Sequence, residues 1–384
     1  MALPEPGPSL RVKLFLVLLG CVFGVLAAEA ACILAYDVLR VYQQRPSWVL
    51  GLTYENVPDF QTHVRGITYR FNRWGLVGDD LPKAKPAGES RLLLLGDSIA
   101  MGVGARPEQG AARLVERALA KSAPAGKTVR LLNFGTLSYN VWDYYYCLRG
   151  KGWGFSPDGV LLFLCLNDAW PKALGLPLPG PDGGVGLWPR LKHLLIKSRL
   201  VYSCLYVFNV NKLLKPLLGR TAGVAVQGLP SDPLSEKLLA TLDPSSREAL
   251  RRGAAEEGWD EGAMRDAIRE ILVDNNWAKA LPALSAMAEE CRRRGVPFKV
   301  AVFPVNFQAM PGWHDERPQK EILAYLRERG IESVDLRPAL AAAGRRGRVF
   351  VRGDMLHPDP AGQAVVAREI LTMFRLRRRS SRPR

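Results

Sequence analysis

The chain is predicted to form an α/β domain in which helices cover both faces of a parallel sheet. Three observations support this fold class. From residue 91 onward, short apolar runs alternate with longer helical patterns, which is typical of buried parallel strands joined by crossover helices. A nearly unbroken apolar stretch near the N-terminus predicts a transmembrane helix. Residues 171–276 interrupt the alternation, and because structureless loops of that length are uncommon, they are expected to be a helical insertion.

The N-terminal apolar stretch, residues 14–36, is expected to cross a membrane. Only Glu29 interrupts it, and at about 1.5 Å per residue it reaches roughly 35 Å, enough to span a bilayer. Arg11 and Lys13 precede it, which favours a cytoplasmic leader over residues 1–13 and an extracytoplasmic location for the rest of the chain.

Two alternatives for this stretch stay open. Residues 27–31 are small apart from Glu29, so a signal peptidase could cleave there and release the remainder. A helix buried in a soluble core is the other alternative.

The remaining elements follow in order. A neck over residues 37–90 ends in a linker rich in Pro and Gly, one domain covers residues 91–376, and a basic tail covers residues 377–384. Predicted strands are 91–95, 129–134, 160–164, 298–303 and 331–334, and predicted helices are 108–121, 277–294, 320–329 and 361–374.

Composition limits the class of protein. Hydrophobic residues make up 48% and charged residues 23% of 384 residues, which excludes a disordered chain and a polytopic membrane protein. The formal charge of +16 suits an anionic membrane surface or an acidic polysaccharide, and the arginine-rich tail could contact such a surface. The sequence contains no zinc-ligand spacing and no nucleic-acid-binding motif, so nucleic acid is not an expected partner. A basic, solvated surface without a partner is the alternative.

Gly96-Asp97-Ser98 directly follows the first predicted strand. Open α/β sheets bind ligands at the carboxyl ends of their strands, so Ser98 is a candidate nucleophile. A serine hydroxyl is a weak nucleophile until a base removes its proton.

The candidate base is His357, one of only four histidines. It follows Asp354 by three residues and precedes the last predicted helix. A carboxylate at this spacing can hold one ring nitrogen while the other nitrogen faces the serine. Alternatively, Asp354 caps a turn and His357 is incidental.

Ester chemistry also needs donors for a developing oxyanion. Gly135 follows the second predicted strand and Asn167 follows the third, so a bare backbone N–H and a side-chain amide are the candidates. Each has a structural alternative, since Gly135 could only make a turn and Asn167 could only cap a helix.

With these motifs in place, the chain resembles the SGNH (GDSL-type) hydrolase superfamily. Gly96-Asp97-Ser98 matches the first block of that family, Gly135 the second, Asn167-Asp168 the third and Asp354-x-x-His357 the fifth. The third block usually begins with glycine, where this chain has Cys165. The segment 71–76 is similar to one that precedes the domain in membrane-anchored bacterial members, which implies a periplasmic location.

The resemblance implies a flavodoxin-like three-layer α/β/α fold with a five-stranded parallel sheet, and no metal or organic cofactor. Ser98 would be the nucleophile, His357 the base and Asp354 its orienting carboxylate. The N–H groups of Ser98 and Gly135 and the side chain of Asn167 would form the oxyanion hole.

Three functions are therefore considered. The first is a membrane-anchored serine esterase that hydrolyses an O-acyl ester on an envelope glycan or lipid. The second is an O-acyltransferase on an envelope glycan with the same residues, and the third is a non-catalytic envelope-assembly protein that keeps the fold for binding.

Overall fold

The computed structural model describes residues 9–40, 42–169, 185–207, 242–259, 268–269, 271 and 275–380. The predicted insertion is therefore described in part. Its described elements are helical, as expected: α5 (Leu187–Leu195), α6 (Arg199–Tyr202), the short helix η4 (Ser203–Val207) and α9 (Pro244–Glu257).

A five-stranded sheet forms the centre of the domain, and every neighbouring pair of its strands is parallel. The strand order is β6-β5-β7-β8-β9, which is the flavodoxin-like order in which the first and second strands exchange places. The predicted fold class is confirmed. The strands are β5 (Glu89–Leu95), β6 (Thr128–Asn133), β7 (Gly159–Leu164), β8 (Phe298–Val302) and β9 (Glu332–Asp335).

Alternation along the strands builds two cores, one on each face of the sheet. In β5, Leu93 and Leu95 join one apolar cluster, whereas Leu92 and Leu94 join the other, because successive side chains of a strand point to opposite faces. The first cluster lies under α4 (Val141–Gly150), α11 (Trp277–Arg293) and α12 (Gln319–Glu328), and the second under α3 (Ala111–Lys121), α13 (Arg337–Gly344) and α14 (Pro360–Ser380).

Two helix boundaries differ from the prediction. The helix expected from residue 108 begins at Ala111, because a 3-10 turn, η2 (Pro107–Gln109), and the extended Gly110 precede it. The last helix continues to Ser380, so residues 377–380 of the predicted tail are helical. Leucine and arginine are good helix formers, and no proline interrupts them before Pro383.

The predicted neck contains four strands and packs against the sheet. β1 (Gln44–Pro46) pairs with β2 (Tyr54–Asn56), and β3 (Phe60–Val64) pairs with β4 (Ile67–Phe71), both antiparallel. An antiparallel bridge from Val77 to Asn133 joins the neck to the edge strand β6. Tyr69 of β4 donates to the carbonyls of Gly102 and Ala105 at 3.1 Å each, so the β3–β4 hairpin is fixed beside the loop that follows Ser98.

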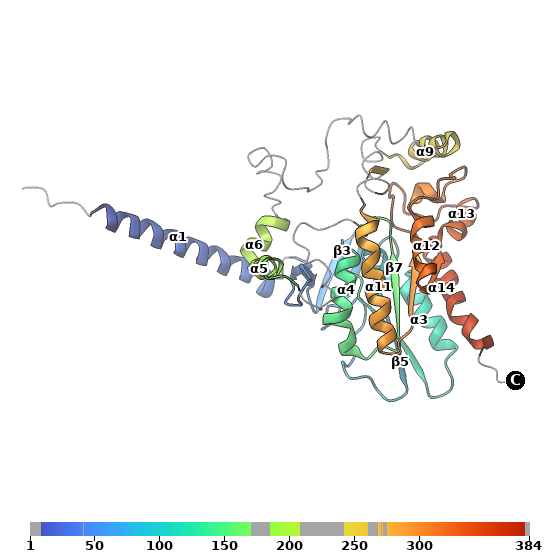
Figure 1. Cartoon of the computed structure of the whole chain (residues 1–384), viewed down its shortest axis with the longest axis horizontal. Coiled ribbons are helices and arrows are strands. Elements are labelled where there is room, and N and C mark those ends of the chain that lie inside the picture. Colours follow the sequence, from blue (N-terminus) through green and yellow to red (C-terminus); the bar gives the residue numbers. More distant parts are fainter. Residues whose placement is uncertain are drawn as a thin grey trace, which may run out of the picture.

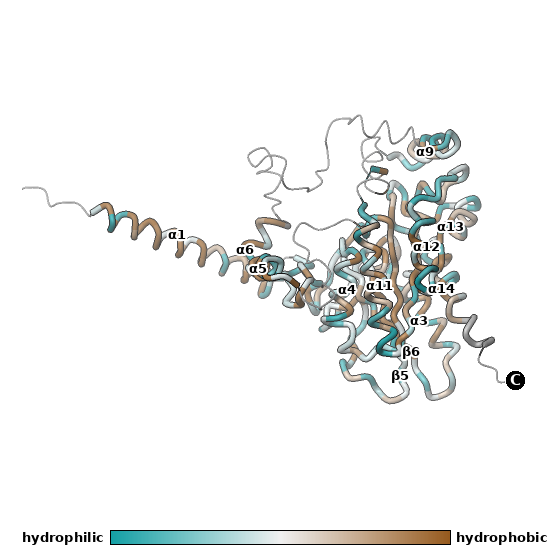
Figure 2. The backbone as a smooth tube through the Cα atoms, in the orientation of Figure 1, coloured by the Kyte–Doolittle hydropathy of each residue, from teal (hydrophilic) through white to brown (hydrophobic). Residues whose placement is uncertain are grey.

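The N-terminal helix α1 (Leu10–Ile33) projects away from the domain (Figure 1) and continues into a helical turn, η1 (Leu34–Val38). None of its residues is buried, and most of them are hydrophobic (Figure 2). A helix of the soluble core is therefore excluded. The stretch Leu10–Val38 is long and apolar enough to cross a membrane.

Candidate active site

Ser98 lies at the carboxyl end of β5, in a sharp turn between the strand and the short helix α2 (Ser98–Met101). The buried Asp97 caps this helix by accepting from the Ile99 N–H at 2.9 Å. The turn requires glycine at position 96, because a Cβ there would lie 2.5 Å from the Cβ of Ala100. The N–H of Ser98 is in the first turn of α2, where a helix provides no backbone acceptor.

The structure brings Ser98, His357 and Asp354 into one hydrogen-bonded chain. The Nε2 atom of His357 is 2.8 Å from Ser98 Oγ, and its Nδ1 atom is 2.7 Å from Asp354 Oδ2. Since Asp354 Oδ2 can only accept when ionised, it favours a proton on Nδ1 and leaves Nε2 as the acceptor for the serine hydroxyl. Asn306 supports this loop by donating its side-chain amide to the Asp354 carbonyl at 3.0 Å.

The Asp354 carboxylate is buried and held by several donors. Its Oδ1 atom accepts from the N–H groups of Leu356 and His357, at 2.7 and 3.1 Å. Burial alone raises the pKa of Asp354, but the hydrogen bonds from the His357 ring and from these N–H groups outweigh it. The net pKa is below the ordinary value, so Asp354 is ionised at neutral pH.

A residue that the sequence analysis missed also reaches Asp354. The guanidinium of Arg65 forms an ion pair with Asp354 Oδ2 at 2.9 Å, although the arginine side chain is half exposed. Arg65 lies in the two-residue turn between β3 and β4, and both Arg65 and Gly66 have positive φ angles, 52° and 75°. This turn type favours Asn or Gly, so an arginine there is unusual, and strained turn residues often lie at functional sites.

Gly135 lies just beyond the end of β6, next to α2. A Cβ at this position would lie 2.4 Å from the Met101 nitrogen, so only glycine permits such a close approach to α2. Its N–H donates to the Oδ1 atom of Asn133 at 2.8 Å, a bond that the sequence analysis did not anticipate. The Asn133 side chain also donates to the Ala100 carbonyl at 2.7 Å, which links the end of β6 to α2.

Asn167 follows β7, on the other side of β5 from Gly135. The buried Asp168 shapes this turn, because its carboxylate accepts from the Cys165 N–H at 2.7 Å and from the Tyr144 hydroxyl at 2.9 Å. The Oδ1 atom of Asn167 is buried and has no hydrogen-bond partner among the described residues. The side chain is therefore not committed to capping a helix.

Cys165 takes the place of the family's glycine without distorting the backbone. It is not among the described non-glycine residues with a positive φ angle, so this position does not require glycine. Its buried side chain packs in the apolar cluster on the α3 face of the sheet.

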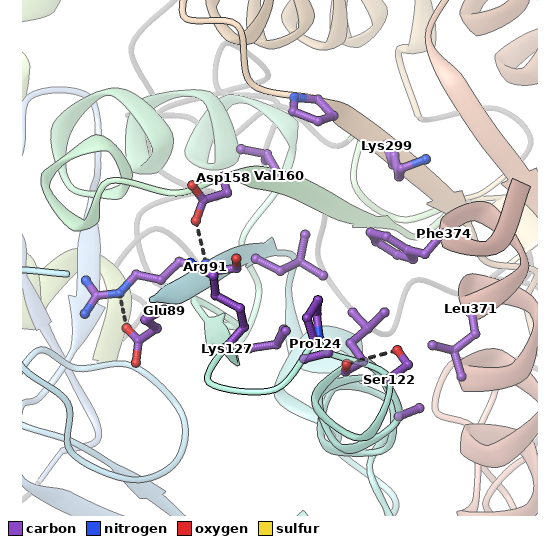
Figure 3. A pocket seen from close by; sticks show the side chains of 18 of the residues that line it. Glu89, Arg91, Ser122, Pro124, Lys127, Asp158, Val160, Lys299, Leu371 and Phe374 are labelled. Carbon is purple, nitrogen blue, oxygen red and sulfur yellow. Dashed lines mark hydrogen bonds and ion pairs between the residues drawn. The ribbon is translucent and has the colours of Figure 1, made fainter. Parts of the chain in front are cut away.

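A cavity of about 750 Å³ lies at the opposite, amino end of the strands (Figure 3). Arg91, Lys127, Lys299, Leu371 and Phe374 are among the residues that line it. None of the residues in the Ser98–His357–Asp354 chain contributes to it, so this cavity does not serve that site.

The fold and the site together define an α/β protein with a Ser–His–Asp chain at the carboxyl edge of a parallel sheet. No family model matches the sequence. Over 154 residues the chain is 30% identical to the probable alginate O-acetylase AlgJ of Pseudomonas aeruginosa, a match that covers 37% of this chain. The match spans only 38% of that relative's length.

Several solved structures are similar in fold at low sequence identity. An α/β hydrolase from the metagenome of Lake Arreo is 15% identical with a TM-score of 0.39, over 74% of this chain and 94% of that one. A G-D-S-L family lipolytic protein from Veillonella parvula is 13% identical with a TM-score of 0.36, over 75% and 98%. An acetylxylan esterase mutant from Geobacillus stearothermophilus is 14% identical with a TM-score of 0.39, over 74% and 93%.

Proposed function

We propose that the protein is a membrane-anchored serine esterase of the SGNH type, which hydrolyses an O-acyl ester outside the cytoplasm. One observation carries the proposal: His357 is within hydrogen-bond distance of both Ser98 Oγ, at 2.8 Å, and Asp354 Oδ2, at 2.7 Å. A nucleophile, a base and a base-orienting carboxylate in this geometry are the requirements of acyl transfer through an acyl-enzyme.

The reaction proceeds in two halves. His357 Nε2 takes the Ser98 proton as Oγ attacks the acyl carbonyl carbon, and the carbonyl oxygen becomes an oxyanion. When that intermediate collapses, the bond to the alcohol oxygen breaks and His357 returns the proton to the departing alcohol. Water then attacks the acyl-enzyme while His357 takes its proton, and the second collapse releases the carboxylic acid and restores Ser98. Asp354 stabilises the imidazolium in both halves.

Three donors would stabilise the oxyanion: the N–H groups of Ser98 and Gly135 and the side-chain amide of Asn167. They come from β5, β6 and β7, which are adjacent in the sheet. Without substrate, the Gly135 N–H donates to Asn133 Oδ1. To stabilise the oxyanion, this N–H must either donate to both oxygen atoms or give up its bond to Asn133.

Arg65 is assigned as a positioning residue. It contacts Asp354 rather than Ser98 or His357, and it joins the β3–β4 hairpin to the loop that carries the base. The neck is then part of the site rather than a spacer.

Transfer to an acceptor hydroxyl is the second candidate function. The 30% identity to a probable alginate O-acetylase favours it, because a sugar hydroxyl can replace water in the second half of the same reaction. The esterase would act on an acylated envelope glycan or lipid, whereas the transferase would use a hydroxyl of an envelope glycan as the acceptor.

A fluorophosphonate probe tests the enzymatic proposal on the full chain in detergent micelles. The wild type should be labelled and should hydrolyse short p-nitrophenyl esters, whereas Ser98→Ala should lose both. Absence of labelling and turnover in the folded wild type would favour the non-catalytic binding protein instead.

A product analysis then distinguishes hydrolysis from transfer. The wild type is incubated with p-nitrophenyl acetate and with an acidic or a neutral oligosaccharide. Free acetate as the dominant product indicates an esterase, and an acetylated oligosaccharide that Ser98→Ala does not form indicates a transferase.

A further inference from the structure

Helix α5 has its apolar face turned away from the rest of the described structure. At about 100° per residue, five apolar side chains occupy an arc of about 120° on one side of this helix. Leu187 and Trp188 are 83% and 65% exposed. The arc consists of Leu187, Trp188, Leu191, Leu194 and Leu195.

The opposite side of α5 faces the domain. His193 is buried there and its Nε2 atom accepts from the Gly51 N–H at 3.3 Å. Ile196, at the end of the helix, is buried on the same side. An amphipathic helix on a soluble protein normally buries its apolar face, so α5 has the reverse orientation.

Basic residues border the apolar arc. Arg190 and Lys192 lie at its two edges, and both are exposed. The turn that carries Trp48 and Leu50 adds two more exposed apolar side chains, and Gly51 of that turn contacts α5. Aliphatic and tryptophan side chains flanked by Lys and Arg are characteristic of helices that lie in a membrane interface.

The C-terminal part of α1 is fixed to the start of α6. The carboxylate of Glu29, the one acidic residue of α1, accepts from the Ser198 hydroxyl at 2.6 Å and from the N–H groups of Arg199 and Leu200 at 2.9 Å each. It therefore caps the first turn of α6, which directly follows α5. Arg199 also pairs with Asp37 at 3.0 Å.

The length of α1 sets the depth of this junction. Fifteen residues without charge, 14–28, separate Lys13 from Glu29, and at about 1.5 Å per residue they reach roughly 22 Å. The hydrocarbon core of a bilayer is about 30 Å thick. Lys13 can extend its side chain toward the headgroups at one end of the span. Because the span is still shorter than the hydrocarbon core, Glu29 and α6 are drawn into the interfacial layer at its other end.

Helix α5 then also lies at the depth of the interfacial layer, and it runs crosswise to α1. Figure 1 shows α5 close to end-on, whereas α1 lies across the picture. We infer that α5, with Trp48 and Leu50, lies in the outer leaflet of the bilayer and contacts anionic lipid through Arg190 and Lys192. This inference rests on the proposed role of α1 as a membrane anchor. The domain would be held to the membrane at two places, which restricts its rotation about α1.

Lipid-dependent quenching of a fluorophore tests this on the full chain. An NBD label is attached at Leu191→Cys, at Val17→Cys on α1, or at the exposed Glu328→Cys on α12, each in a Cys21→Ala, Cys32→Ala, Cys204→Ala background. The protein is placed at one copy per nanodisc of phosphatidylcholine and phosphatidylglycerol, with or without nitroxide groups on the lipid acyl chains.

Quenching at positions 17 and 191 but not at 328 would support the inference. Quenching at 17 alone would overturn it while leaving the anchor in place, and quenching at neither would overturn both. A blue-shifted but unquenched label at 191, in a single-copy disc, would mean that protein covers this face and would also overturn the inference. Fluorophosphonate labelling of the same samples reports separately on the enzymatic proposal.

Discussion

Replacing Gly135 by alanine tests whether the close contact between the end of β6 and α2 positions Ser98, the proposed nucleophile. The added Cβ would lie 2.4 Å from the Met101 nitrogen and 2.7 Å from its Cα. Both atoms belong to the backbone of α2, which begins at Ser98, so no side chain can rotate away to make room. An ordinary contact begins near 3.4 Å, and the two segments must therefore separate by roughly 1 Å.

A displacement of this size is expected to lower both the rate and the stability. A misplacement of about 1 Å can lower a rate about 100-fold, equivalent to ~2.7 kcal/mol of activation free energy. Overpacking itself costs about 1–3 kcal/mol of unfolding free energy. The variant keeps the Gly135 N–H, so the loss would report geometry rather than a missing donor.

The assay is kcat for p-nitrophenyl acetate hydrolysis, together with thermal unfolding, on the full chain in detergent micelles. Gly347→Ala is the control, because a Cβ at that position meets no atom within 4 Å. The control should match the wild type. If folded Gly135→Ala also kept the wild-type kcat, the argument that this contact positions Ser98 would be refuted.

Three further predictions concern the residues around Ser98. Asn167→Ala should lower kcat by about 100- to 1,000-fold with little change in KM, the usual effect of removing an oxyanion donor; an unchanged kcat would contradict that role. Arg65→Asn, which suits the left-handed turn, should lower kcat about fivefold, since a half-exposed pair contributes about 1 kcal/mol. Arg65→Lys should recover part of the rate. Arg40→Asn, at another left-handed position, is the control and should have no effect. If Arg65→Asn instead raised KM without changing kcat, Arg65 would contact the substrate. Folding lowers the pKa of Asp354, so the ionised carboxylate stabilises the folded state. This stabilisation is fully present above the pKa of the unfolded state, near 3.8, and is lost as the pH falls through the lower pKa of the folded state. The difference in unfolding free energy between the wild type and Asp354→Asn should therefore shrink below about pH 3.8, and denaturant unfolding at several pH values would show whether it does.

The sheet was predictable because its strands carry strong local signals. Leu92–Leu95 and residues 160–164 are continuous apolar runs, and such runs occur in strands that are buried on both faces. The strand order came from the family resemblance, since the hydrophobic pattern of a single strand does not identify its neighbours. The proximity of Ser98, His357 and Asp354 was predictable because each lies beside a strand end or in a short motif.

The contacts of the neck were harder to predict. Its strands are three to five residues long, and Arg65-Gly66 is not one of the usual turn pairs, so the hairpin gave little local signal. The Arg65–Asp354 pair joins distant parts of the chain, and the bond between Gly135 and Asn133 depends on a side-chain rotamer. Neither can be read from spacing along the sequence.

The cap that Glu29 places on α6 also bears on whether α1 could be removed by a protease. A signal peptidase acting at residues 27–31 would need that segment extended, whereas all of it is helical. Glu29 is also bound to Arg199 and Leu200 of α6 and to Ser198, which precedes this helix. Cleavage would then require local unfolding of this junction. Folding of the domain and proteolysis at residues 27–31 would therefore compete in time, and a chain that folds first would keep α1.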